Sequence, residues 1–383
     1  MRCWNGGPDA DILAATAGLR YRFPKTTSTG ETLMSAFTRR LLPACIAAAL
    51  LTPAAAHAET VEQLYEKAKA EKTLTFYAGG PTAPYEARIK AFQEKFPGIQ
   101  VSVEGGFSNV LNQKIEKQMA DGKLAVDFAF FQTVQDFVNW KKRGKLLNFK
   151  PDGFDRIIPN LRDPDGAYMA FAAITIAYAY NTNLVKPEGV PKSALDFLKP
   201  EFAGKLISVY PHDDDAALYL FHIIVQKYGW NWMDRYMANK PHFIQGHLPV
   251  ARAIADGKMA ATLDATVTTA GGQKRMGKPI EIAFSEADET PVFTVTGGIF
   301  KDAPHPNAAK LFVSWYLQAE QQARLGTFSA RTDVAPPAGF KPLTSYKIAN
   351  NFREFITDDR LIADLRKRFE AYTGPAVNKG GVR

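Results

Sequence analysis

The chain has 383 residues, a formal net charge of +8, 46% hydrophobic residues and 22% charged residues, a composition that excludes wholesale disorder and favours two or three globular domains. Its two cysteines, Cys3 and Cys45, are too few for a disulfide scaffold or a four-cysteine zinc site. No stretch reaches the roughly 18 uncharged apolar residues of a membrane-spanning helix, so the sequence excludes an integral membrane transporter.

The N-terminal region has the order of a secretory signal. Two positive charges, Arg39 and Arg40, precede the uncharged stretch 41–56, and Ala56-His57-Ala58 fits an A-x-A cleavage site. We therefore expect translation to start at Met34, residues 1–33 to be an over-extended gene prediction, and cleavage after Ala58 to release a cysteine-free periplasmic protein. The alternative, an N-terminal core helix, is interrupted by prolines at 43 and 53.

The first part of the mature chain alternates between strands and helices. Short apolar strands are expected at 73–77, 99–103 and 124–131, and apolar residues at helical spacing predict helices at 61–68, 85–96 and 108–121, followed by one that ends at Gly144. Strand, loop and helix repeated three times is typical of an α/β fold with a parallel sheet.

A second series of elements follows. Strands are expected at 174–180, 205–210, 259–263, 280–284 and 293–300, with a helix at 216–228 and another around 311–315. Two series predict two lobes. We expect lobe 1 to span 59–174, lobe 2 to span 175–290, and residues 291–383 to return to lobe 1 and add C-terminal helices.

Enzyme motifs are largely missing from the sequence. There is no G-x-S-x-G, H-E-x-x-H, C-x-x-C or G-x-G-x-x-G. The stretch 272–278 has the spacing of a phosphate-binding loop, but Pro279 follows where a magnesium-binding Ser or Thr would stand, and the segment precedes a strand. We therefore reject a nucleotide-binding loop.

The densest polar cluster is His212-Asp213-Asp214-Asp215. It fits a solvated turn whose last aspartate caps the helix at 216, a ligand-facing loop after a strand, or a metal site. His222 shares an apolar helical stripe with Leu218 and is expected in the core. The basic residues are dispersed, so nucleic acid is not an expected partner.

Four local phrases resemble one family when they are taken in order. They are 91–101 (AFQEKFPGIQV), 193–205 (SALDFLKPEFAGK), 303–312 (APHPNAAKLF) and 331–334 (RTDV). They are similar to phrases of the periplasmic solute-binding proteins of ABC importers, in the branch of ferric-ion, phosphonate and sugar-phosphate binders. The resemblance covers essentially the whole mature chain.

The resemblance implies an α/β, two-lobe periplasmic-binding-protein fold of type II, with the ligand cleft between the lobes. In open α/β sheets, ligands bind beyond the carboxyl ends of strands and near helix N-termini. The candidate ligand-binding residues at such places and on the crossing strand are Gly80, Thr82, Ser108, Asn109, Thr133, Thr175, Tyr178, Asp213, Asp214, Thr266, Thr268 and Thr269.

The sequence departs from the ferric binders of that branch, which use a pair of adjacent tyrosines in lobe 2. The matching stretch, 265–272 (ATVTTAGG), has no tyrosine. Hydroxyls, glycine amides and helix N-termini suit an oxyanion such as a phosphate ester, phosphonate or carboxylate. Asp213 and Asp214 favour a cationic or polyhydroxylated group instead, and a zwitterion or sugar phosphate reconciles both.

Two functions remain open from the sequence. The first is a monomeric receptor, without cofactor or catalytic residues, that binds a small solute and delivers it to the membrane permease of an ABC importer; within this reading a ferric ion is the alternative ligand. The second is a periplasmic hydrolase or transferase that uses the same cleft. The absence of a nucleophile motif favours the receptor.

Overall fold

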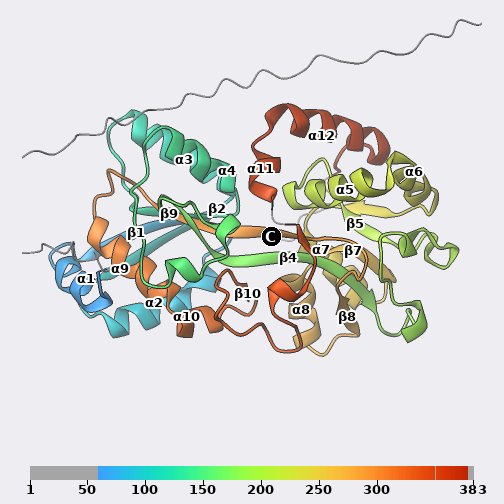
Figure 1. Ribbon diagram of the computed structural model, residues 1–383, viewed down its shortest axis with the longest axis horizontal. Coiled ribbons are helices and arrows are strands. Elements are labelled where there is room, and N and C mark those ends of the chain that lie inside the picture. The colour runs from blue at the N-terminus through green and yellow to red at the C-terminus, as the bar shows by residue number, and fades with distance from the viewer. Residues whose placement is uncertain (1–58, 350, 378–383) are drawn as a thin grey trace, which may run out of the picture. The chain divides into compact units, whose positions relative to one another are not determined.

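The computed structural model describes residues 59–349 and 351–377, and Figure 1 shows the arrangement of their elements. The predicted start at Met34, the signal sequence and its cleavage after Ala58 lie outside the described residues. Within them, no helix has the length and apolar character needed to cross a membrane.

The first lobe is built on three parallel strands. Strand β1 pairs with β2 on one side and with β3 on the other. The helices α3 and α4 lie above these strands in Figure 1, and α1 and α2 lie below. The bounds are β1 Thr73–Gly79, β2 Gln100–Gly106, β3 Phe128–Phe131, α1 Val61–Ala68, α2 Ala83–Lys95, α3 Ser108–Ala120 and α4 Val134–Lys142.

Two long strands, β4 (Met169–Asn181) and β9 (Thr290–Ile299), connect the first lobe with the second. Strand β4 pairs antiparallel with β9 up to Thr175 and with β7 from Ile176 onward. Strand β9 is also antiparallel to β3. Because β9 carries the chain back into the first lobe, the carboxyl ends of β1–β3 point toward the second lobe.

The second lobe repeats this plan in the opposite direction. Strands β5 and β6 are parallel, and β7 and β8 pair antiparallel with β4. Because β4 enters this lobe, the carboxyl end of β7 points back toward the first lobe. The bounds are β5 Ile207–Val209, β6 His242–Ile244, β7 Ala261–Thr266, β8 Ile280–Ala283, α5 Asp215–Tyr228, α6 Trp230–Ala238, α7 His247–Ala255 and α8 Val267–Arg275.

The remaining chain returns to the first lobe and then forms the C-terminal helices. Strand β10 pairs with β4 at the opposite end of the sheet from β2, in the order β10-β4-β9-β3-β1-β2. The bounds are α9 Pro306–Leu317, α10 Ala319–Ala323, β10 Phe328–Ser329, β11 Ile348–Ala349, α11 Phe352–Ile356 and α12 Asp359–Thr373; six 3-10 turns lie at Phe154–Arg156, Pro159–Leu161, Pro187–Gly189, Asp196–Leu198, Pro200–Phe202 and Leu343–Ser345.

The α/β fold with two strand series is confirmed, with local differences. Strand β3 is shorter than predicted, because the Asp127 carboxylate before it accepts hydrogen bonds from the backbone N–H groups of Thr75 and His305. Helix α3 begins at Ser108, as predicted, and Phe107 is its cap residue. His222 is buried, as predicted.

Candidate functional site

The carboxyl ends of β1 and β3 meet the N-terminus of α3 in one polar cluster. The Ser108 hydroxyl donates to Oε1 of Gln132 at 3.2 Å, and Nε2 of Gln132 donates to the carbonyl of Gly79 at 3.2 Å. A Cβ on Gly79 would overlap both Gln132 Oε1 and Ser108 Oγ. The glycine therefore lets a hydroxyl and an amide converge beside a helix N-terminus; we call Gly79, Ser108 and Gln132 the first-lobe cluster.

The neighbouring candidates surround this cluster. Gly80, with a φ of 99°, bridges back to Gly106, and Thr82 is the cap residue of α2. A Cβ on Gly105 would lie 2.6 Å from the Gly80 carbonyl oxygen, so these backbones approach closely. Asn109 is exposed, and among the described residues its side chain accepts from the adjacent Val110 N–H alone, at 3.0 Å.

Thr133 is the cap residue of α4, but its hydroxyl is directed inward. It donates to the Asp136 carboxylate, which also accepts from Asn112. Burial raises the pKa of Asp136, while the two donors lower it. The Thr133 hydroxyl is therefore engaged at the N-terminus of α4 and is not free to bind a ligand.

The second lobe holds a group of hydroxyls at the N-terminus of α8. Thr266 caps this helix by accepting from the Thr269 N–H at 3.2 Å, and its hydroxyl lies 3.0 Å from that of Thr268 and 2.7 Å from that of Thr269. Thr266 is buried and the other two are half-buried. These three residues, the threonine cluster, place hydroxyls where the helix dipole favours negative charge.

Beside the threonine cluster lies a buried ion pair that the sequence analysis missed. The fully buried Asp264, at the carboxyl end of β7, accepts from the Ser208 hydroxyl at 2.9 Å and lies 2.9 Å from Nε2 of His247 at the start of α7. Burial lowers the pKa of His247, but the carboxylates of Asp264 and Asp214 raise it by more, to about 9. His247 is therefore a cation at neutral pH.

The predicted acidic loop is occupied by internal contacts. Oδ1 of Asp214 caps α5, accepting from Ala216 and Ala217 at 2.9 and 3.0 Å, and its other oxygen lies 3.7 Å from His247. The cap is thus Asp214 and not Asp215, as one interpretation of the sequence had it. The Asp213 carboxylate accepts from Gln245 at 2.7 Å. Neither carboxylate is left without a protein partner.

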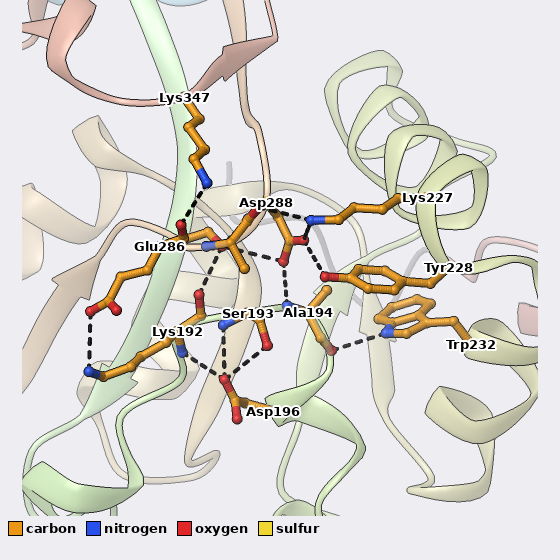
Figure 2. A network of polar contacts seen from close by, with 12 residues as sticks. Lys192, Ser193, Ala194, Asp196, Lys227, Tyr228, Trp232, Glu286, Asp288 and Lys347 are labelled. Atoms are coloured by element: carbon orange, nitrogen blue, oxygen red, sulfur yellow. Dashed lines mark hydrogen bonds and ion pairs between the residues drawn. The ribbon is translucent and has the colours of Figure 1, made fainter.

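The two candidates on the crossing strand face protein. Thr175 is fully buried, and its hydroxyl has no hydrogen-bond partner in the described structure. The Tyr178 hydroxyl donates to Asp288 at 3.1 Å, and its ring packs against Phe197. Tyr178 thus belongs to the network centred on Asp288, part of which Figure 2 shows.

The Asp288 network ties together three segments of the second lobe. Its carboxylate, 6% exposed, accepts from the Ala194 N–H at 2.6 Å, from Lys227 at 2.7 Å and from Tyr228 (Figure 2). Burial raises the pKa of Asp288, but Lys227 and the other donors lower it further, below its usual value. These donors hold β4, Ala194 and the end of α5 to the segment around Asp288.

The sequence-predicted residues therefore form two separate groups. Among the described hydrogen bonds, none joins the first-lobe cluster to the threonine cluster. Helix α4 does contact α5, because Gln135 donates to Asp215 at 3.4 Å. Both groups offer hydroxyls, amides and helix N-termini. Within residues 59–349 and 351–377, no group of three His, Cys, Asp or Glu side chains could hold a metal ion.

A cavity of about 1070 Å³ is lined by none of the residues of these two groups. It is bounded by one side of α8, by β8 and by the segments before β10 and before β11. Of the predicted residues it contains none, although Val267 and Gly271 of α8 line it.

The sequence is similar to that of known proteins. Residues 87–347 match the family model described as bacterial extracellular solute-binding protein. A probable ABC transporter periplasmic-binding protein, y4fP of Sinorhizobium fredii, is 22% identical over 280 residues, covering 70% of this chain and 75% of the relative.

Two solved structures give the same fold. Iron-bound HitA from Pseudomonas aeruginosa superimposes with a TM-score of 0.65 at 19% identity, covering 78% of this chain and 99% of that chain. AfuA from Actinobacillus pleuropneumoniae, with fructose-6-phosphate bound, gives 0.64 at 20% identity, covering 79% and 99%. At these identities the likeness establishes the two-lobe fold alone.

Proposed function

The chain belongs to the family of bacterial extracellular solute-binding proteins, and we propose that it is a receptor that binds an organic oxyanion, such as a phosphate ester, phosphonate or carboxylate, between its lobes and delivers it to the permease of an ABC importer. The family and its association with ABC transport agree with the resemblance found in the sequence. That the protein acts as a monomeric, non-catalytic receptor is part of the proposal.

The observation that carries the ligand class is the threonine cluster. Three hydroxyls gather at the N-terminus of α8, where the helix dipole and the N–H groups of the first turn attract anions. Residues 264–269 include no tyrosine, so this stretch offers no phenolate ligand to a hard ferric ion. The His247 cation offsets part of the negative charge of Asp264 and Asp214, the two carboxylates beside it.

The first-lobe cluster supplies the opposite side of the proposed site. Ser108, Gln132 and the backbone of Gly79 and Gly80 stand at the ends of strands that point toward the second lobe. Neither cluster alone would enclose a ligand, so a bound ligand would contact both clusters. We therefore expect binding to draw the lobes together, with an energetic contribution from each side.

Two changes test the proposal together. The double variant Thr268→Val, Thr269→Val removes hydroxyls without changing side-chain volume much, and an oxyanion left without these donors should bind at least tenfold more weakly, at roughly 1–3 kcal/mol per unsatisfied group. Asp214→Asn preserves the α5 cap, so affinity for an anion should hold or rise.

The natural ligand is found by denaturing the purified protein and analysing the released small molecules by mass spectrometry. Titration calorimetry with that molecule, or with fructose 6-phosphate and inorganic phosphate as probes, then measures each variant. Unchanged affinity in the threonine double variant would place the site elsewhere. Chemical turnover of the bound molecule would show that the protein is an enzyme and not a receptor.

A further inference from the structure

The cavity beside α8 has its own walls and lies at a different place in the sheet from the proposed solute site. In the order β10-β4-β9-β3-β1-β2, the first-lobe cluster follows β1–β3, whereas the cavity is lined by residues leading into β10 and by β8. Helix α8 is shared. Val267, Gly271, Lys274 and Arg275 line the cavity, and the threonine cluster does not.

One wall of the cavity is aromatic. Phe284 stacks on Tyr346, with ring centroids 4.0 Å apart and ring planes at 23°, and Phe340 meets Phe284 edge-on at 5.9 Å. All three rings are half-buried and line the cavity. Half-buried rings around an open cavity favour a flat apolar partner, because they exclude water from it at little conformational cost.

The other wall carries positive charge. Arg275 and Lys341 line the cavity, and within the described residues neither side chain makes an ion pair or a hydrogen bond. Lys347, which also lines the cavity, has no ion pair but donates to the Glu286 carbonyl at 3.1 Å. The cavity's two glutamates, at 281 and 286, are each paired with a lysine. The two unpaired cations face the same space as the aromatic wall. Their charge is thus available to an anionic group, and a guanidinium suits a carboxylate, sulfonate or phosphate.

A glycine inside a helix leaves room between these walls. Gly271 lies within α8, where alanine would be the better helix former. A Cβ there would lie 3.4 Å from Arg275 Nη1 and 3.9 Å from Ile282 Cδ1. A methyl group would fit in that space once Arg275 shifts slightly, so packing alone does not require glycine at position 271. Because Gly271 has no side chain, the cavity is larger than it would be with alanine.

From the volume, the aromatic wall and the two unpaired cations, we propose that this cavity is a second binding site, for an organic anion that carries a flat apolar ring system. The volume of about 1070 Å³ is slightly above the roughly 300–1,000 Å³ of small-molecule sites. A bare ion or inorganic phosphate would leave the aromatic wall unused. The proposal does not depend on which solute the cleft between the lobes binds.

The test uses 8-anilinonaphthalene-1-sulfonate, a flat apolar anion that fluoresces when bound, and its neutral analogue N-phenyl-1-naphthylamine. The folded parent should bind the sulfonate in the cavity and prefer it to the analogue. The double variant Arg275→Ala, Lys341→Ala should bind the sulfonate at least tenfold more weakly and lose that preference. Gly271→Leu, which fills the cavity, should weaken both probes.

Matched controls make the outcome decisive. Lys278→Ala removes a charge just after α8 that pairs with Asp256 outside the cavity, so it should bind both probes as the parent does. Circular dichroism and melting curves establish that each variant is folded. Parent-like binding by both cavity variants, or no sulfonate binding by the folded parent, would overturn the proposal. Loss of binding only in the threonine double variant would show that the probe binds in the cleft between the lobes, and this result would also overturn the proposal.

Discussion

At the scale of single residues, the clearest reassignment concerns Tyr178. The alternation of a strand places every second side chain on the same face, so a tyrosine on the crossing strand is an obvious candidate to face a ligand. Its hydroxyl instead donates to Asp288, 110 residues later in the chain. No local pattern in the sequence predicts a pairing over that separation, and only the folded chain shows which face of β4 is lined by protein.

Removing the Asp288 carboxylate should therefore destabilise the protein without weakening solute binding. Asp288→Ala leaves the buried donors Tyr178 and Ala194 N–H without an acceptor. We expect a loss of about 2–4 kcal/mol, less than for a fully buried pair because Lys227 is 45% exposed. Urea unfolding measures it. Glu286→Ala breaks an exposed pair and should cost under about 1 kcal/mol; equal losses in both variants would contradict the structural role.

His247 makes stability depend on pH. Its folded-state pKa of about 9 is above its usual value of 6.5, so its stabilising contribution is complete below about pH 6.5 and is lost as pH rises to about 9. The shift corresponds to at most about 3 kcal/mol. Unfolding free energies from pH 6 to pH 9.5 should fall for the parent and fall much less for His247→Gln.

The matched control for that pH dependence is His222→Gln. Burial lowers the pKa of His222, so its own contribution changes below pH 6.5 and the slope above it should be unaffected. A parent-like slope in His247→Gln would assign the titration to another group. The pair of His247 and Asp264 has no sequence signature, since 17 residues and a helix separate the two side chains.

At the scale of elements, most helices and strands could be predicted because apolar periodicity and glycine or proline breaks mark them. The ends of the helices and strands were predicted less accurately. Leu124 to Val126 are apolar enough to extend β3, yet side-chain hydrogen bonds of Asp127 bring Thr75 and His305 to the place where pairing would start. The threonine cluster was predicted as a ligand-facing stretch, and its binding role stays a prediction.

Glycine at the end of β1 should matter for the site more than for the fold. Gly79→Ala brings a methyl group against Gln132 Oε1 and Ser108 Oγ, and both are flexible side-chain ends that can move apart. Solute affinity should fall about tenfold while the melting temperature changes by only a few degrees. Gly106→Ala, at the end of β2, meets only Leu111 at 3.5 Å and should keep parent affinity in the same titration. A larger effect of Gly106→Ala would separate the proposed site from the β1 end.

At the scale of the whole molecule, the two strand series predicted two lobes, and the pairing of β4 changes partner at Thr175–Ile176, where the sequence placed a boundary. The division of residues 59–174, 175–290 and 291–383 between lobes stays an interpretation. The contacts of the C-terminal helices could not be predicted, because they depend on long-range packing. Arg366 of α12 pairs with Asp215, and Tyr219 of α5 donates to Asn351.

These C-terminal helices should be indispensable for folding. Their buried apolar side chains are Phe352, Phe355, Ile356, Leu365 and Phe369. Phe369 packs against Phe221 and Trp230, and Phe352 packs against Phe293 of the crossing strand β9. Each buried side chain contributes about 1.5–3 kcal/mol, so the five together match the about 5–15 kcal/mol of total stability that a protein has.

A chain that ends before Asn351 should consequently fail to fold, whereas one that ends at Val377 keeps every contact described above. Circular dichroism and size-exclusion chromatography of the two truncated proteins measure the difference. The shorter chain should be aggregated or lack a cooperative melting transition, because it exposes the apolar partners on α5, α6 and β9 at once. A soluble, cooperatively melting short chain would show that the two lobes fold without the C-terminal helices.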